Sequence, residues 1–430
     1  MDQEEEPEDI ASVGPPGGGL RRFALDLSPF RSRDYRLLWV GEVVSKTGHQ
    51  ITLVAVYVQI YQLTRSAAAV GVVGIVQLVP LMFASLFGGP LVDRLDRRRL
   101  LLFTEIGLVG ASSLLLLGAL MGRPPLWLVY GAAGLGAGLG GLETPTRTAL
   151  IPNLVGRDRL ASAITLHQIL WNTAMIVGPA IAGLIIARLG LVWAYGIDVA
   201  TYGATILSVA LMRPAPPAED GTSAVTGLRA VREGLAFLRR RGVLQVAFLA
   251  DLIAMVFGNP RALFPILAVV QFHRGSEAVG LLFSAFAVGA LLGAISAGWV
   301  RHVDRQGRAV LIAVGIWGAA IAAFGLVGDL FLLGLIFLAV AGGADVVSAV
   351  LRGTILQQSI PDALRGRMSG VHSLVVQGGP RLGDFEAGLV ATATSATVSV
   401  VLGGVAVLVG VSLLAMLAPR FRRYRRGAPT

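Results

Sequence analysis

The sequence predicts an all-α membrane protein with about twelve transmembrane helices, on the evidence of its composition, its recurring apolar segments and the placement of its arginines. Of its 430 residues, 54% are hydrophobic and only 14% are charged. A soluble fold of this length could not bury so much apolar surface, so the excess must face lipid. A spanning helix needs roughly 20 mostly apolar residues, and such stretches recur from residue 37 to residue 417.

The spans follow from apolar windows separated by charged residues or by Pro and Gly. We expect two bundles of six helices, over 37–212 and 243–418. The expected spans are 37–63, 70–92, 100–121, 126–146, 161–187, 189–212, 243–272, 277–300, 309–327, 329–351, 367–393 and 394–418.

Three segments lie outside these bundles. Residues 1–36 begin acidic and continue rich in Pro and Gly, without the short apolar core of a signal peptide, so we expect a disordered cytoplasmic tail. The segment 213–242 is a cytoplasmic linker that ends in GLRAVREGLAFLRRR. This run predicts an amphipathic helix on the membrane surface, with its arginines at the headgroups of membrane lipids. Residues 419–430 form a basic cytoplasmic tail.

The basic residues are unequally divided between the two ends of the predicted helices. The tails and alternate loops on one side carry 29 arginines, whereas the opposite loops carry four, Arg65, Arg123, Arg188 and Arg274. By the positive-inside rule the crowded side is cytoplasmic. We therefore expect a multi-pass protein of the cell (plasma or inner) membrane with both termini in the cytoplasm. The net charge of +10 reflects this topology and not a nucleic-acid partner.

The two halves of the chain resemble each other. RTALIPNLVGRDRLASA (147–163) and RGTILQQSIPDALRGRMSG (352–370) each place a basic residue before a short polar loop with Pro and then Arg-x-Arg. The first residues of these two segments are 205 positions apart, and the same offset separates GPAIAG (178–183) from GDFEAG (383–388). This repetition predicts two pseudo-symmetric six-helix bundles around a central site.

Several function classes are excluded by what the sequence lacks. The chain has no cysteine, which rules out disulfides, thiolate metal sites and cysteine nucleophiles. Lys46 is the single lysine and follows Ser45 inside a span, so no P-loop is present, and neither are the His-Glu-x-x-His and Gly-x-Ser-x-Gly motifs. We expect no enzyme activity, no cofactor and no metal site. A membrane scaffold or receptor of the same fold remains an alternative.

Three ionisable residues share one face of the first span. Glu42, Lys46 and His49 fall at i, i+4 and i+7. Because charge facing lipid is costly, they must line a cavity or another helix. This pattern is consistent with an ion pair between Glu42 and Lys46 that stabilises helix packing. It is equally consistent with a role of these residues in binding cargo.

Two aspartates lie near the middle of their spans, Asp198 in the sixth and Asp251 in the seventh. Burial away from water favours the neutral carboxyl, so either side chain is a candidate for proton exchange. Asp251 is preferred, because no basic residue lies within one helical turn of it. Asn259 and Arg261 in the same span are candidate cavity residues.

The eleventh span carries three charged residues close together. Arg381 and Asp384 are three apart and are expected to form a structural pair, which leaves Glu386 without a partner and makes it a candidate cavity residue. Asp345 and Arg352, near the inner end of the tenth span, are expected to form a gate or a loop contact.

A loop motif follows the second span, GPLVDRLDRRRLLL (89–102), with a degenerate copy, GWVRHVDRQGR (298–308), in the second half. It resembles the signature of the major facilitator superfamily, Gly-x-Leu-x-Asp-Arg-x-Gly-Arg-Lys, but has Asp96 where Gly is usual. The resemblance implies that Asp93 latches the inner gate through the dipole of the eleventh span, near Met368. A solvated, positive-inside loop is the alternative. The residues of this gating motif are Gly89, Asp93, Arg94, Arg97 and Arg98.

The fifth span contains ILWNTAMIVGPAIAGLI, which resembles a helix-kink element of proton-driven exporters at Gly178, Pro179 and Gly183. Plain packing is an equally good interpretation. Three segments resemble the branch of siderophore and multidrug exporters that includes the enterobactin exporter, namely residues 30–71, LVGRDRLASA and VVQGGPRLGDFEAGLVA. The resemblance runs from about residue 34 to residue 417. The resemblance implies efflux of a siderophore or drug-like small molecule from the cytoplasm. We expect a monomeric secondary transporter that works by proton antiport with alternating access. Proton-coupled uptake is the alternative.

Overall fold

The computed structural model describes residues 26–213, 228–361 and 364–425. Within these ranges the long elements are all α-helices, as the sequence predicts. They are α1 (Arg33–Thr64), α2 (Ala67–Arg94), α3 (Arg97–Leu120), α4 (Leu126–Val155), α5 (Leu160–Arg188), α6 (Leu191–Ala210), α7 (Leu228–Leu238), α8 (Gly242–Phe257), α9 (Phe264–Val270), α10 (Ser276–Ser296), α11 (Gln306–Leu326), α12 (Phe331–Ser359), α13 (Arg365–Ala393), α14 (Ala396–Leu417) and α15 (Pro419–Arg422).

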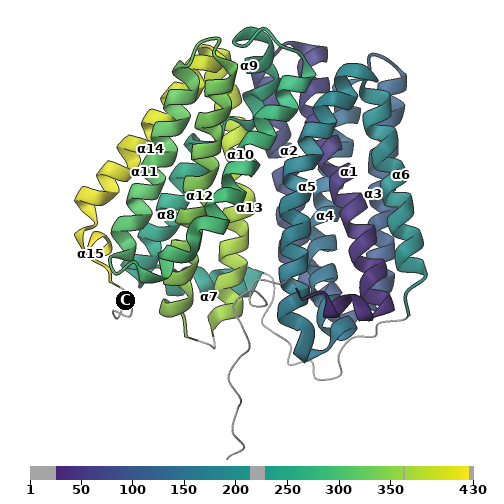
Figure 1. Cartoon of the computed structure of the whole chain (residues 1–430), viewed down its shortest axis with the longest axis horizontal. Coiled ribbons are helices and arrows are strands. Elements are labelled where there is room, and N and C mark those ends of the chain that lie inside the picture. Colours follow the sequence, from purple (N-terminus) through teal and green to yellow (C-terminus); the bar gives the residue numbers. More distant parts are fainter. Residues whose placement is uncertain (1–25, 214–227, 362–363, 426–430) are drawn as a thin grey trace, which may run out of the picture.

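Eight of the described helical segments are long and apolar enough to cross a membrane by length and composition alone. α1, α4, α6 and α13 fall short of that criterion although they run alongside the others (Figure 1). These four helices carry buried polar side chains, including Glu42, Glu143, Asp198 and Asp384. Polar residues turned toward the protein interior lower the mean hydropathy of a span without exposing charge to lipid.

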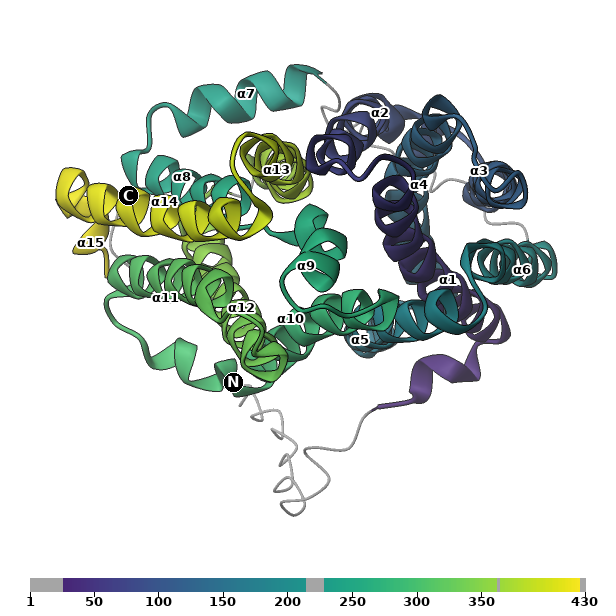
Figure 2. The ribbon, with the colours of Figure 1, turned by 90° about the horizontal axis from the view of Figure 1, so that it is seen from above.

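The helices form two bundles, α1–α6 and α8–α14, which lie side by side (Figure 1). In the view from above, the bundles meet at α2 with α13 and at α5 with α10 (Figure 2). α1 and α15 place both described ends of the chain on one face, here called the terminal face; the other is called the opposite face.

Glycines bring the bundles close together near the opposite face. A Cβ added to Gly183 of α5 would lie 3.0 Å from the Cα of Gly280 in α10, and one added to Gly71 of α2 would lie 3.0 Å from the Cα of Gly388 in α13. Gly183 and Gly388 are the last glycines of the two repeated segments, so the repeat places equivalent residues at equivalent contacts. Only a residue without a side chain allows helix backbones to pack this closely.

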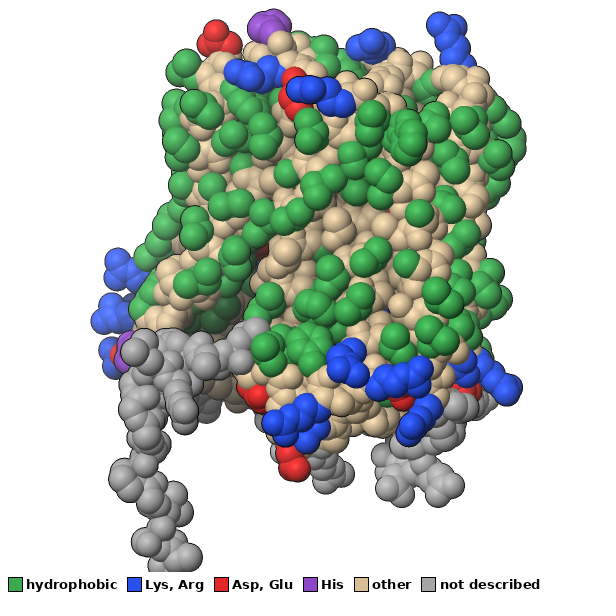
Figure 3. Space-filling view, turned by 45° about the vertical axis from the view of Figure 1, so that its right-hand side comes forward, with side chains coloured by type: hydrophobic (Ala, Val, Ile, Leu, Met, Phe, Trp, Pro, Cys, Tyr) green, Lys and Arg blue, Asp and Glu red, His purple; other side chains and the backbone are tan. Residues whose placement is uncertain are grey.

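The side surface matches a protein surrounded by lipid. Hydrophobic side chains form a broad belt between two ends that carry most of the visible charge (Figure 3). Large apolar side chains such as Trp127 (73% exposed) and Leu332 (75% exposed) would be unfavourable in water over such an area but are stable against acyl chains.

The seventh span is not the continuous helix that the sequence predicts over 243–272. α8 ends at Phe257, and a short 3-10 turn, Arg261–Leu263, separates it from α9. Pro260 has no backbone N–H and interrupts the helical ladder, while the carbonyl of Gly258 accepts a hydrogen bond from Trp317 Nε1 at 3.1 Å. A broken helix at membrane depth is stable where it is buried in protein.

α7 runs crosswise to the spans near the terminal face and lies next to α8 and α13 (Figures 1 and 2). Phe237 and Leu238 pack against the hydrophobic core. Residues 1–25 of the predicted tail over 1–36, the linker residues 214–227 and the side chains of the first four residues of α7 lie outside the described residues.

Candidate functional site

A cluster of buried charges lies inside the first bundle. Lys46 Nζ of α1 is 2.7 Å from Glu143 Oε2 of α4, and Arg147 Nε is 2.8 Å from Glu143 Oε1 one turn away. Arg147 also forms an ion pair with Glu105 of α3. We call this set, together with Glu42 and His167, the N-bundle charge cluster.

The partner of Glu42 differs from the one expected. Its Oε2 lies 3.3 Å from Nδ1 of His167 in α5, whereas Lys46 pairs with Glu143. The prediction of a Glu42–Lys46 ion pair is therefore wrong, because the side chains of α4 and α5 approach α1 more closely than the two residues approach each other. The cluster holds three carboxyl groups against two permanent cations and one histidine. Charges taken out of water are tolerated only when paired in this way.

A pocket of about 210 Å³ opens beside the cluster. Trp171 (40% exposed) forms part of its wall, and Lys46 Nζ lies 5.8 Å from the centre of its ring. The pocket belongs to the half of the bundle nearer the terminal face, since α1 and α5 both begin there. Its lining residues are Glu42, Lys46, Thr144, Arg147, His167, Gln168 and Trp171.

Asp198 occupies a separate buried position in the same bundle. Its Oδ2 accepts hydrogen bonds from the hydroxyl groups of Thr52 at 2.6 Å and Ser112 at 2.7 Å. Its Oδ1 is buried and has no hydrogen-bond partner among the described residues. Gly48 makes room for this carboxyl, because an added Cβ would lie 2.8 Å from Oδ1.

His49 lines the cavity beside Asp198 and not the pocket at Glu42 and Lys46. Its Nδ1 is 3.2 Å from the hydroxyl of Tyr202 in α6. The cavity has a volume of about 70 Å³, and Arg381 of α13 in the other bundle reaches its wall. The shared helix face that the sequence indicates thus serves two neighbouring sites.

The second bundle contains a buried ion pair between Asp251 of α8 and Arg352 of α12. Asp251 Oδ1 lies 2.6 Å from Arg352 Nη2, and Arg352 Nη1 donates to Ser348 Oγ at 2.6 Å. The expectation that no basic residue would hold Asp251 ionised is wrong, because the arginine comes from another helix. Arg352 is 5% exposed and forms this internal pair instead of a gate or loop contact, whereas Asp345 Oδ1 is buried without a hydrogen-bond partner among the described residues.

Asp384 links the two bundles. Its Oδ2 accepts a hydrogen bond from the hydroxyl of Tyr57 in α1 at 2.7 Å, and Asn259 Nδ2 lies 3.5 Å from its Oδ1. The predicted pair with Arg381 is wrong: Arg381 donates instead to the backbone carbonyl of Gln377 at 2.7 Å. Tyr57 and Asn259 reach the carboxyl because the break in the seventh span and the packing of α1 bring them there.

The remaining expected cavity residues are spread around this contact. Arg261 lies with its guanidinium 5.7 Å from the ring centre of Phe286. Glu386 is partly buried, with no hydrogen bond or ion pair described for it. Neither residue joins the N-bundle charge cluster.

The gating motif is only partly described. The structure describes only the backbone of α2 at Gly89, Asp93 and Arg94, so the expected latch stays a prediction. Arg97 Nη1 donates to the carbonyl of Ala149 at 3.0 Å, and Arg98 Nε donates to that of Val209 at 3.0 Å. These two arginines tie the start of α3 to α4 and α6.

The substitution of Asp for Gly at position 96 has a local role. Asp96 is the N-cap of α3, where its Oδ1 accepts from the backbone N–H of Arg99 at 2.9 Å. Such a cap stabilises the first turn of a helix.

The helix-kink motif of α5 divides its contacts between the two bundles. Pro179 lies inside the helix, and Gly178 packs against Gln50 of α1. Gly183, one turn further, packs against α10 of the other bundle. Ser284 of α10 adds a hydrogen bond from its hydroxyl to the carbonyl of Ile176 at 2.7 Å.

The family profile of the transmembrane secretion effectors matches residues 24–425 of this chain. The chain belongs to that family. The enterobactin exporter of Citrobacter koseri is 30% identical over 416 residues, which cover 95% of this chain and 97% of the relative. The enterobactin exporter of Shigella boydii is 29% identical over 415 residues, covering 95% of this chain and 97% of that protein.

Solved structures of membrane transporters share the fold of this chain. A mutant of the nucleoside transporter NupG superposes with a TM-score of 0.74 at 14% identity, over 90% of this chain and 100% of that chain. A bacterial homologue of the iron transporter ferroportin, in an inward-facing state, superposes with a TM-score of 0.68 at 15% identity, over 91% of this chain and 99% of that chain. The protein is a multi-pass membrane transporter of the major facilitator superfamily and not an enzyme.

Sequence reasoning missed several residues of the interior of the first bundle, namely Glu105, Glu143, His167 and the hydroxyl donors Thr52 and Ser112. Glu143 carried a usable signal, because it stands one turn before Arg147 in α4. Arg147 itself was expected at the very end of the fourth span and was counted with the cytoplasmic loop, since the predicted span ended at 146, whereas α4 continues to Val155.

Proposed function

We propose that this transporter exports a small molecule, a siderophore or a drug-like compound, from the cytoplasm by proton antiport with alternating access. The observation that carries the proposal is an asymmetry along the spans. Near the opposite face the bundles are closed against each other at Gly183 and Gly71, whereas a pocket with partly exposed Trp171 and His167 lies in the half nearer the terminal face. A pocket on one side and a closed contact on the other is the arrangement that rocking bundles interconvert.

The orientation proposed is that the terminal face is cytoplasmic. The excess of arginine on that side supports this orientation. Arg147 and Arg352 are buried inside the bundles, and the excess changes little when these two residues are removed from the count. Reporter fusions at Gly221 and Thr430 should be active only as cytoplasmic reporters, and activity on the outer surface at either position would contradict this topology.

The proposed cargo site is the pocket at the N-bundle charge cluster, extended by His49, Asn259, Arg261 and Glu386 as the bundles move. Lys46 beside the ring of Trp171 offers a cation and an aromatic face, which suit an anionic aromatic compound. The relatives named as enterobactin exporters make a siderophore the first cargo to test.

The proposed proton carriers are Asp198 and Asp251. Asp198 has a free buried oxygen beside a small cavity, so it can take up a proton without breaking an ion pair. Asp251 can do so only by releasing Arg352. A carboxyl that alternates between a neutral and a charged form can couple the proton gradient to the change of state.

The gating motif is proposed to act as the inner latch, with Asp93 at the N-terminal end of α13. A charge–dipole contact contributes about 0.3–1 kcal/mol, and up to ~2 if partly buried, enough to shift a balanced equilibrium severalfold. Asp93→Asn should impair transport at unchanged membrane abundance. Unchanged transport would favour a solvated loop.

Asp198→Asn and Asp251→Asn in proteoliposomes test the coupling. Each variant should lose uphill movement of enterobactin while keeping downhill exchange, because the neutral amide cannot release a proton. Asp329→Asn, at an exposed aspartate between α11 and α12, is the matched control and should behave as the unchanged protein. Full accumulation by both interior variants would remove these carboxyls from the mechanism. Uptake, the second candidate function, predicts movement in the opposite direction in the same preparation.

A further inference from the structure

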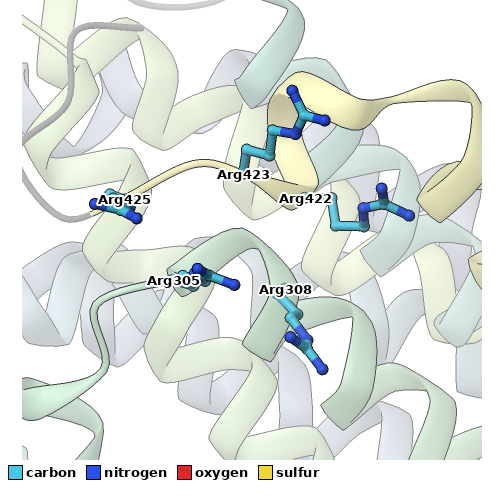
Figure 4. A pocket seen from close by; sticks show the side chains of 5 residues that line it. All are labelled: Arg305, Arg308, Arg422, Arg423 and Arg425. Carbon is cyan, nitrogen blue, oxygen red and sulfur yellow. The ribbon is translucent and has the colours of Figure 1, made fainter.

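A basic pocket of about 640 Å³ lies on the terminal face between the start of α11 and α15. Figure 4 shows the five arginine side chains that line it, which come from the N-cap and first turn of α11 and from α15 and the residues after it. The lining residues are Arg305, Arg308, Arg422, Arg423 and Arg425. This pocket is remote from the N-bundle charge cluster, which lies in the other bundle.

The pocket is held in place by buried aromatic anchors. Phe421 (1% exposed) and Tyr424 (5% exposed) pack into the hydrophobic core of the second bundle. The backbone N–H of Gly307 in α11 donates to the carbonyl of Tyr424 at 3.5 Å. Because Arg422 and Arg423 stand between the anchors, the same packing turns them outward on a fixed backbone.

The charge of the pocket is poorly compensated within the described residues. Asp304 forms the ion pair described there, with Oδ2 3.9 Å from Arg425 Nε, and both side chains are more than half exposed. Like charges gathered at one site repel unless an anion joins them. The planar fork of a guanidinium matches phosphate oxygens in two hydrogen bonds.

The surface next to the pocket is apolar. Leu417 (79% exposed), Met416 (65% exposed) and Ile312 (51% exposed) lie just beyond the arginines on α14 and α11. A ligand with a phosphate head and acyl chains would contact the arginines of the pocket and this apolar surface at once, whereas a soluble phosphate would contact only the arginines.

We propose that this pocket binds the phosphate headgroup of an anionic phospholipid, with its acyl chains along α11 and α14. Basic pockets at the membrane surface recognise lipids of this chemistry. The site also gives a role to the second copy of the loop motif, because Arg305 and Arg308 belong to it. The site holds independently of whether the transporter exports or imports its cargo.

Native mass spectrometry of the full chain in detergent tests the proposal, with cardiolipin, phosphatidylglycerol and phosphatidylcholine of identical acyl chains as probes. The two anionic lipids should bind, cardiolipin with its two phosphates more tightly, and phosphatidylcholine should not. Arg422→Gln with Arg423→Gln and Arg425→Gln should weaken cardiolipin binding by about two orders of magnitude, since each arginine near an anionic headgroup contributes roughly a factor of five.

The matched control replaces three exposed arginines on the same face of the first bundle, Arg31, Arg33 and Arg36, with Gln. It removes the same charge and should leave cardiolipin binding within about a factor of two of the unchanged protein. Equal losses in both triple variants would show a diffuse basic face and overturn the site. So would complete displacement of cardiolipin by millimolar inorganic phosphate, which would indicate a soluble anion. A melting temperature matching that of the unchanged protein confirms that each variant is folded.

Discussion

The closed contact near the opposite face should be opened by adding a single methyl group to Gly183. A Cβ at this position would lie 2.8 Å from the carbonyl oxygen of Ser276, 3.0 Å from the Cα of Gly280 and 3.1 Å from the Cα of Glu277. These are backbone atoms of α10 and cannot rotate away, so the helices must separate. Overpacking of this kind costs about 1–3 kcal/mol, which would shift a two-state equilibrium roughly 5- to 150-fold toward the state in which this face is open.

The absence of cysteine makes the test clean, since spin labels attach only to introduced thiols. Labels at Arg188→Cys and Asp329→Cys, one exposed position in each bundle, report the distance across the opposite face by pulsed electron paramagnetic resonance. Gly183→Ala should increase the population at long distance. Gly110→Ala is the matched control, because a Cβ there meets nothing within 4 Å. Identical distance distributions in the two variants would refute the idea that this contact holds the face closed.

Two further variants probe the buried polar contacts. Lys46→Met leaves Glu143 paired only with Arg147 and should cost about 1.5–3 kcal/mol of stability, seen as a lower melting temperature of the purified protein. Exposed Arg123→Met should change stability by less than about 0.5 kcal/mol, and equal melting temperatures of the two variants would contradict the pairing. Tyr57→Phe removes the donor to Asp384, a loss of about 1.5–3 kcal/mol to the closed state, so the same spin labels should show more of the open population. An unchanged distribution would show that this hydrogen bond is present in both states.

The fold was predictable from sequence because each span carries its own signal. Length and hydropathy locate the helices, and the 205-residue repeat predicts two similar bundles. Gly183 and Gly388 are related by this 205-residue repeat and have the same structural role, because close backbone contact at the bundle interface requires a residue without a side chain. The break at Pro260 was missed, because the mean hydropathy of a segment does not depend on whether one backbone N–H is absent.

The partners of the buried charges were not predictable, because pairing in space depends on helices far apart in sequence. Reasoning from neighbours three or four residues away suggested that Arg381 would pair with Asp384 and that Asp251 would have no cation. In the structure Tyr57 comes from α1 and Arg352 from α12. Both arrive through packing between helices, for which one sequence contains no direct signal.

Accumulation of enterobactin in everted membrane vesicles energised by respiration tests the central claim most directly. In these vesicles the cytoplasmic face is outward and protons are pumped into the lumen, so an exporter coupled to protons should move the siderophore inward against its gradient. One elementary charge contributes about 2.3 kcal/mol per 100 mV. We predict accumulation that a protonophore abolishes. Accumulation that persists with the protonophore, or none above vesicles lacking the protein, would contradict proton-driven export of this siderophore.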